Sequence, residues 1–202
     1  MRQPKMYSIF GKPGTGKTHK LISLLRARVA KGDRAIVIDP DGAEDAWDQF
    51  TRYDSVADVP DNFKGIVVVE YHEGKTFANI YARCTAKKLK NFMLVLDDPN
   101  IYSLPSPEDE LANLLRRKRQ YSMDILTTSH GWSECPQAFL RFIDIYILGP
   151  TDSSPRERSA LLGRTVMARH ERWKLLVDQH KRTKPNEYPW VIFQRDGQKI
   201  AR

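Results

Sequence analysis

The feature that most constrains this chain is the segment Gly-Lys-Pro-Gly-Thr-Gly-Lys-Thr at residues 11–18. It matches the phosphate-loop pattern G-x-x-x-x-G-K-T. The apolar run Met6–Phe10 precedes the segment, and we expect a helix from about Lys17 to follow it. A strand, a glycine-rich turn and a helix N-terminus together surround a phosphate chain with backbone N–H groups and a partial positive charge. The segment therefore predicts that the chain binds a nucleoside triphosphate.

The whole loop supplies the predicted nucleotide-binding residues: Gly11, Lys12, Pro13, Gly14, Thr15, Gly16, Lys17 and Thr18. In this pattern Lys17 reaches the β- and γ-phosphates, and the Thr18 hydroxyl binds Mg²⁺. A glycine-rich turn without a ligand is the alternative, which the complete pattern and its strand–loop–helix setting disfavour. ATP and Mg²⁺ are the expected ligands.

Composition is that of an ordinary globular protein. The chain has 202 residues, of which 41% are hydrophobic, enough for one domain with a sizeable core. No apolar run has the length that a bilayer requires, so we expect neither a signal peptide nor a membrane span, and a cytoplasmic location. Cys84 and Cys135 lack metal-ligand spacing and are expected to be reduced thiols.

The net charge is +8, and the pI is near 9.5. Such a balance permits attraction to nucleic acid, although a basic surface that only keeps the protein soluble would look the same. Basic residues gather at residues 87–90, at residues 116–119 and between Arg164 and Lys184. This clustering favours a nucleic-acid partner.

Apolar strands alternate with polar or amphipathic stretches, a pattern typical of a parallel sheet covered by helices. The expected strands are Met6–Phe10, Arg34–Asp39, Gly65–Glu70, Phe92–Asp97, Asp124–Thr128 and Ile143–Leu148. The expected helices cover residues 17–30, 42–51, 76–88, 107–121, 136–141 and 155–162, with a further helix possible over 166–180. Several strands are continuous apolar runs, which indicates burial on both faces.

Local signals refine two parts of this scheme. Ser106 followed by Pro107 and two acidic residues predicts a helix start. The tail Tyr188–Ile200 is expected to form a hairpin around Asp196-Gly197. We expect residues 1–150 to form a P-loop core and residues 151–202 a C-terminal extension of the same domain, with a helical stretch and the hairpin.

A second site signal is the run Phe92-Met-Leu-Val-Leu that ends in Asp97 and Asp98. An apolar strand ending in an acid is the Walker B arrangement, in which Asp97 would hold Mg²⁺. Asp98 would then activate the attacking water as a general base. The run Ile66–Glu70 also ends in an acid, but we prefer the first because it carries paired carboxylates.

Polar residues also close the next expected strand. Thr128, Ser129 and His130 are candidates to sense the γ-phosphate or to orient the water, with a weak preference for the last two. The basic residues Arg116, Arg117 and Arg119 are candidates for an arginine finger that acts on a neighbouring subunit. A solvated helix end, favoured by the helix dipole, is the alternative for each arginine.

With these residues identified, the chain resembles the FtsK–HerA branch of P-loop ATPases, and within it the small viral genome-packaging ATPases and the Zot-like proteins of filamentous phages. The resemblance rests, in order, on Gly11–Thr18, Ala35–Pro40, Leu94–Asp98, Arg119–His130 and Ile143–Leu148. The chain departs from the family pattern at the strand end, where Ser129 or His130 replaces Gln, and at Asp98, where Glu is usual.

The resemblance implies a three-layer α/β P-loop NTPase of the additional-strand (ASCE) type with a mainly parallel sheet. It makes Arg119 the preferred arginine finger, beside Lys17, Asp98 and His130 as the other catalytic candidates. It also implies a homo-oligomeric ring of five or six subunits around DNA, bound without sequence preference. A capsid or portal vertex protein would be a further partner, and a viral protein would be found in the host cytoplasm or with the virion.

Three functions therefore compete. The first is an ATP-hydrolysing DNA translocase that packages a viral genome. The second is a small-molecule kinase, for which the arginines between residues 150 and 184 could form a lid. A kinase would place its Walker B strand beside the strand that leads into the phosphate loop, whereas we expect Asp124–Thr128 to lie between them. The third is an assembly factor that binds a nucleoside triphosphate without hydrolysing it.

Overall fold

The computed structural model describes residues 3–40, 45–102, 109–184 and 189–195. The strands are β1 (Met6–Phe10), β2 (Arg34–Asp39), β3 (Thr51–Tyr53), β4 (Gly65–Glu70), β5 (Phe92–Leu96), β6 (Met123–Ser129), β7 (Ile145–Leu148) and β8 (Val191–Gln194). The α-helices are α1 (Lys17–Val29), α2 (Thr76–Thr85), α3 (Glu110–Arg117), α4 (Gln137–Leu140) and α5 (Ser159–Thr183). Short 3₁₀ helices cover Asp45–Trp47, Val56–Asp58 and Pro155–Arg158.

The strands form one eight-stranded sheet in the order β3-β4-β2-β5-β6-β1-β7-β8. All neighbours are parallel except β7 and β8, which form an antiparallel pair at one edge. Strand β6 pairs with β1 on one side and with β5 on the other. This order confirms the predicted P-loop fold with an additional strand between the phosphate-loop strand and the strand that ends in the paired acids.

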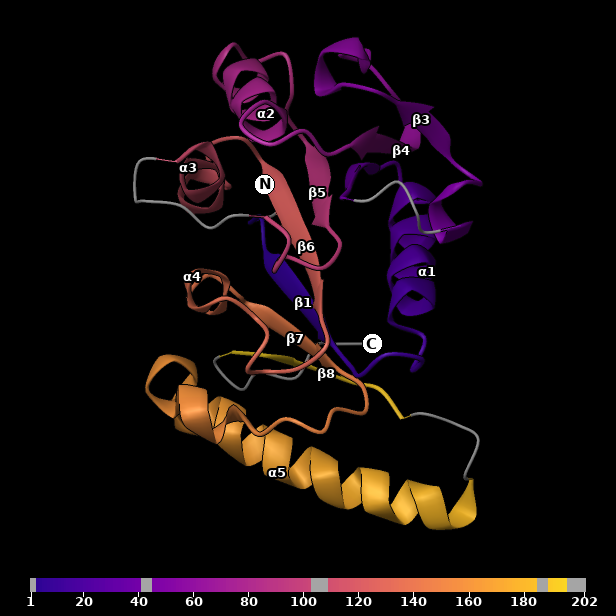
Figure 1. Cartoon of the computed structure of the whole chain (residues 1–202), viewed down its shortest axis with the longest axis vertical. Helices are drawn as coiled ribbons and strands as arrows, with labels where there is room; N and C mark the ends of the chain where they lie inside the picture. Colours follow the sequence, from indigo (N-terminus) through magenta and orange to yellow (C-terminus); the bar gives the residue numbers. More distant parts are fainter. Residues whose placement is uncertain (1–2, 41–44, 103–108, 185–188, 196–202) are drawn as a thin grey trace.

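Helices cover both faces of the sheet, so the molecule has three layers. Figure 1 shows α1 on one face and α2, α3 and α4 on the other. Side chains alternate between the two layers along each strand: in β2, Ile36 and Ile38 pack on the α2–α4 side, whereas Val37 packs with Leu21 and Leu25 of α1. This alternation follows from the two-residue period of a strand, and it explains why β2 is apolar throughout.

The region between β2 and β4 differs from the prediction. A helix was expected over residues 42–51, but residues 45–47 form one 3₁₀ turn and residues 51–53 form the edge strand β3. The helical prediction is therefore wrong over its C-terminal part. Arg52 in β3 donates to Asp39 at 2.7 Å and forms an ion pair with Asp48, and these contacts tie the segment to β2 as an extended strand.

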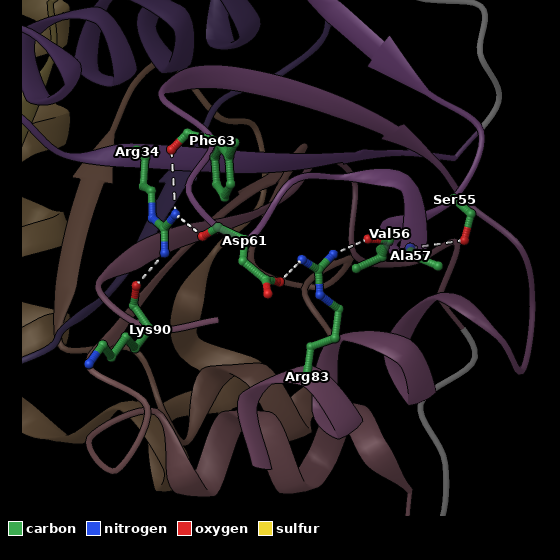
Figure 2. A network of polar contacts seen from close by, with 8 residues as sticks. All are labelled: Arg34, Ser55, Val56, Ala57, Asp61, Phe63, Arg83 and Lys90. Carbon is green, nitrogen blue, oxygen red and sulfur yellow. Dashed lines mark hydrogen bonds and ion pairs between the residues drawn. The ribbon is translucent and has the colours of Figure 1, made fainter. Parts of the chain in front are cut away.

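Polar contacts fasten the following connection to the sheet (Figure 2). Arg34 at the start of β2 donates to the carbonyl oxygens of Asp61 and Lys90, and its guanidinium lies 4.6 Å from the ring centre of Phe63. Arg83 of α2 contacts the Asp61 carboxylate and the carbonyl oxygen of Val56. The two arginines thus tie the connection between β3 and β4 to β2 and to α2.

The predicted start of the helix near residue 107 and the predicted turn of the tail hairpin lie outside the described residues. The predicted helix start at Ser106 and Pro107 lies outside them, and α3 is capped by Asp109, whose side chain accepts from the Leu111 N–H at 2.7 Å. The predicted tail turn at Asp196-Gly197 also lies outside them. Within the described residues, the antiparallel partner of β8 is β7.

The helices expected over residues 155–162 and 166–180 form one long element. A 3₁₀ turn leads into α5, which changes direction at Gly163 with a φ of 78°. Val166, Trp173 and Val177 are buried and pack against the sheet on the α2–α4 side. Of the helices in the described parts of the chain, none combines the length and the apolar character needed to cross a bilayer.

Candidate nucleotide-binding site

The loop at residues 11–18 lies where β1 ends and α1 begins. Gly14 and Gly16 have φ angles of 75° and 80°, a left-handed conformation that glycine adopts without strain. Gly16 is the N-cap residue of α1. The loop therefore ends at a helix N-terminus whose N–H groups are free of intrahelical partners, as anion binding requires.

Both strands beside β1 hold the loop in place. The Gly11 N–H donates to the Ser129 carbonyl at the end of β6, at 3.1 Å. The Lys12 N–H donates to the Pro150 carbonyl just beyond β7, at 2.7 Å. Within the loop, the buried Thr15 hydroxyl donates to the Lys12 carbonyl at 2.7 Å. The start of the loop is thus fixed to the carboxyl ends of its neighbours.

Lys17, His130 and Asp98 come together at this edge. The Lys17 ammonium donates to His130 Nδ1 at 2.8 Å, because a protonated amine has only donors. The other ring nitrogen, Nε2, lies 3.7 Å from Asp98 Oδ2. All three side chains are partly exposed. His130 therefore bridges the phosphate-loop lysine and the second of the paired acids.

Thr128 links the two acids to β6. Its hydroxyl donates to Asp97 Oδ1 and accepts from the Asp98 N–H at 3.0 Å. Asp98 has a φ of 44°, an uncommon value that aspartate tolerates better than most residues. The weak preference for Ser129 and His130 over Thr128 therefore overlooked a direct contact. Its hydroxyl at a strand end was the available signal.

The candidate Mg²⁺ ligands pass a test of fit. Asp97 is 9% exposed, and its Oδ2 atom is buried with no hydrogen-bond partner among the described residues. A buried carboxylate oxygen without a partner is costly unless a cation or a donor completes it. Mg²⁺ is usually bound by one or two side chains together with substrate phosphates, so Thr18 and Asp97 suit it. No cluster of three His, Cys, Asp or Glu that could hold a metal occurs in the described ranges.

The rival acid Glu70 lies too far from the loop. Strand β4 is four strand intervals from β1, or about 19 Å, whereas β5 is two intervals, or about 10 Å, from β1. Asp97 and Asp98 follow β5. The sheet order therefore favours the paired acids.

The three candidate arginines do not join this cluster. Arg116 and Arg117 end α3, and Arg119 follows in the turn before β6. This turn is at the amino end of β6, and the loop is at its carboxyl end, about 20 Å away along seven residues. All three arginines are exposed. They cannot contact a phosphate bound to the loop of the same molecule.

One residue near the acids had no sequence signal. The buried hydroxyl of Tyr102 contacts the carbonyl oxygens of Ile38 and Asp97 at 2.9 and 3.1 Å. Burial raises the pKa of this hydroxyl well above its ordinary value, with a smaller contribution from Asp97. Tyr102 therefore acts as a neutral donor that fixes the ends of β2 and β5. Tyr102 follows Asp98 by only four residues, but it belongs to no motif pattern.

Comparisons with known proteins bear on the family and the fold. A model of the type IV secretion-system coupling protein DNA-binding domain matches residues 2–59, less than a third of the chain. No curated protein sequence matches the chain significantly. The match to the coupling-protein domain model covers the phosphate loop, α1, β2 and β3.

Solved structures match over a wider range. The genome packaging NTPase B204 of Sulfolobus turreted icosahedral virus 2, in complex with AMP, has a TM-score of 0.71 at 14% identity, with 100% of this chain and 99% of that chain covered. B204 of Sulfolobus turreted icosahedral virus, a DNA-packaging ATPase, gives 0.70 at 15% identity over 99% and 100%.

The N-terminal domain of zonular occludens toxin from Neisseria meningitidis matches less closely. Its TM-score is 0.50 at 14% identity, over 75% of this chain and 79% of that domain. At such identities, the likeness establishes the fold. The chain has the P-loop NTPase fold, and this fold is similar to that of the B204 packaging NTPases.

Proposed function

We propose that this chain is an ATP-hydrolysing DNA translocase, a subunit of a motor that moves a viral genome into a capsid. The observation that carries the proposal is the position of β6 between β1 and β5. The end of β6 supplies Thr128 and His130, which contact the paired acids and the loop lysine. A group that contacts both can sense whether the γ-phosphate is present. In this proposal residues 1–150 form the ATPase core, and residues 151–202 extend it.

The loop holds the triphosphate, and Lys17 exchanges its contact with His130 for the β- and γ-phosphates. Thr18 and Asp97 would hold Mg²⁺, which neutralises charge on the phosphates when it is bound. Gly11, Lys12, Pro13, Gly14, Thr15 and Gly16 complete the phosphate cradle. The Oδ2 atom of Asp97 supports this assignment, because it is buried without a hydrogen-bond partner among the described residues and a cation would satisfy it.

Asp98 takes the proton of the attacking water. Thr128 fixes its backbone N–H, and His130 lies beside its carboxylate. A base held from two directions stays within reach of the water, which compensates for a side chain one methylene shorter than Glu. When Lys17 leaves His130 for the phosphates, the His130 ring becomes able to contact the γ-phosphate, and the position of the ring would then depend on whether that phosphate is present.

Arg119 completes the site of a neighbouring subunit. Its distance from its own phosphate loop and its exposure suit a residue that acts on another copy. A guanidinium stabilises the charge that develops as the phosphoryl group is transferred. The functional unit is then a homo-oligomeric ring of five or six copies, with a capsid or portal vertex protein as a further partner.

DNA is the proposed cargo, bound without sequence preference. The net charge of +8 and the structural similarity to B204, a DNA-packaging ATPase, support this choice. The type IV coupling-protein DNA-binding domain model, matched over residues 2–59, supports it as well. Contacts of basic side chains with phosphates predict affinity that falls steeply with salt and varies little with sequence.

The test is phosphate release measured at rising protein concentration, without DNA and with single- or double-stranded DNA, beside the control Lys17→Ala. We expect DNA to stimulate turnover, turnover per subunit to rise cooperatively with concentration, and the control to be inactive. Bound ATP without phosphate release in any arm would identify an assembly factor. Phosphate transfer to a small acceptor would identify a kinase, although the sheet order is not the one expected of such enzymes.

A further inference from the structure

Trp190 lies against the phosphate loop although it is about 170 residues away in the sequence. Its six-membered ring covers Gly149, just beyond β7: a Cβ added to Gly149 would lie 2.6 Å from ring atoms Cη2 and Cζ3. The same Cη2 atom lies 3.4 Å from the position of a Cβ on Gly11. Glycine at both positions therefore lets the indole reach the backbone where the loop begins.

Trp190 also differs in exposure from the other tryptophans of the chain. The chain has four, and Trp47, Trp132 and Trp173 are at most 3% exposed. Trp190 is only half-buried. A large aromatic side chain that keeps exposed surface beside a phosphate-binding loop is available to contact a ligand held by that loop.

The geometry of the loop determines on which side the base of a nucleotide must lie. Asp98 and His130, at the ends of β5 and β6, lie on one side of β1, where the γ-phosphate and the attacking water belong. The base is at the other end of the nucleotide. It therefore extends toward the opposite side of β1, where β7 ends, the antiparallel strand β8 begins and Trp190 lies.

We propose that Trp190 is the stacking platform for the base of the bound nucleotide, and that the ligand is a purine nucleoside triphosphate. The inference rests on the proposed binding of a nucleoside triphosphate by the loop. An indole face binds a base through its π-system and contact area, without reading the hydrogen-bonding edge. ATP and GTP therefore bind with similar affinity, and the smaller bases of CTP and UTP bind more weakly.

The test compares a ligand with a base and a ligand without one. Calorimetric titrations use Mg·ATP and Mg·tripolyphosphate on the wild type, Trp190→Ala and Trp190→Phe. We expect Trp190→Ala to weaken ATP binding about tenfold and to leave tripolyphosphate binding within twofold, while Trp190→Phe retains most of the ATP affinity. An equal loss for both ligands would mean that Trp190 only supports the loop, and no loss for either would also overturn the proposal.

A second variant keeps the ring but moves it. Gly149→Ala places a methyl group where the ring now lies. We expect the same selective loss of ATP affinity, and an unchanged ATP affinity would count against the proposal. ATP should quench the tryptophan fluorescence of the wild type and of the matched control Trp47→Phe, but not that of Trp190→Phe. If wild-type protein binds neither ligand, the proposed function fails instead, with Lys17→Ala as the reference for lost phosphate binding.

Discussion

Two buried aspartates at opposite ends of neighbouring strands show how this sheet separates structure from chemistry. Asp124, in β6, has both oxygens satisfied: Oδ1 accepts from the Lys5 N–H at 2.7 Å, and Oδ2 accepts from Arg28 at 2.8 Å. Asp97, just beyond β5, has one oxygen bound to Thr128 and the other without a partner among the described residues. A carboxylate with both oxygens hydrogen-bonded, which we call closed, stabilises the fold. A carboxylate with one oxygen lacking a partner, which we call open, can bind a ligand.

Other charged residues show the same contrast between the amino ends and the carboxyl ends of the strands. At the amino ends, Lys118 pairs with Asp144, and Arg34 and Arg83 bind fixed carbonyl groups. At the carboxyl ends, Lys17 is held by His130, which is itself 3.7 Å from Asp98. A lysine held by an imidazole nitrogen exchanges that partner for a phosphate at little cost, because an anionic acceptor binds an ammonium more strongly. Charged side chains at the amino ends thus bind fixed partners within the fold, whereas Lys17 at the carboxyl ends has a partner that a ligand can replace.

Arg119→Ala should have the largest effect, because it removes the one proposed catalytic group at the amino end of the sheet. We expect turnover to fall on the order of 10³-fold with ATP affinity nearly unchanged. Mixing this variant with Lys17→Ala should restore part of the activity, since one subunit supplies the arginine and the other the loop. Steady-state phosphate release from the mixture is the measurement. Mixtures as inactive as their components would count against a finger that acts on a neighbour.

Asp98→Asn should lower kcat on the order of 10²-fold, because an amide cannot accept the proton of the attacking water. KM for ATP and the thermal midpoint should stay close to the wild-type values, since the shape of the side chain is kept. Steady-state kinetics and a melting curve measure both. Normal turnover in this variant would show that Asp98 is not the base.

Asp124→Asn and Asp97→Asn form a matched pair that tests the comparison directly. Asp124→Asn should lower the free energy of unfolding by about 2 kcal/mol, since it breaks a buried pair with Arg28, while turnover per folded molecule is retained. Asp97→Asn should change the stability little and lower turnover per folded molecule. Urea unfolding and phosphate release separate the two effects. If the two variants behaved alike, the distinction between open and closed carboxylates would be wrong.

His170→Phe should have the smallest effect, which depends on pH. Burial lowers the pKa of His170 to about 4, with Lys174 adding to the shift and Glu171 opposing it. The unfolded chain therefore binds the proton more readily, and wild-type stability falls as the pH drops from about 6.5 to 4. Relative to the variant, this loss should reach about 1–2 kcal/mol by about pH 5.5, measured by urea unfolding at several pH values. A constant difference between the two proteins would contradict the shifted pKa.

Much of the fold could be predicted because its signals are local. Strands β2, β4 and β5 are apolar runs bounded by polar residues, and their predicted bounds differ from the observed ones by at most one residue. The helix predicted at residues 42–51 failed because Arg52 finds its partners in Asp39 and Asp48, and these contacts depend on the tertiary structure. Edge strands of three residues carry little signal of their own.

The candidate site divides in the same way. The loop and the paired acids were predicted because each is a continuous run, and we expected His130 near the phosphate only from its position after a strand. Thr128 was one of three candidates at its strand end, but its bond to Asp97 was not specified, and the contacts of the Tyr102 hydroxyl and the Trp190 ring were not predicted. Each comes from a different strand end or connection. No pattern in one stretch of sequence specifies which strand ends become neighbours.

The sequence by itself determined that residues 11–18 form a phosphate loop, because glycines at fixed spacing before a helix leave the backbone few alternatives. It also determined that Asp97 and Asp98 end a buried strand. Only the tertiary structure decided that Arg119 lies at the opposite end of β6 from its own loop, that the Thr128 hydroxyl binds Asp97, and that Trp190 lies against Gly11. The physical reason is that backbone conformation is set by near neighbours, whereas the order of strands is set by packing across the whole core.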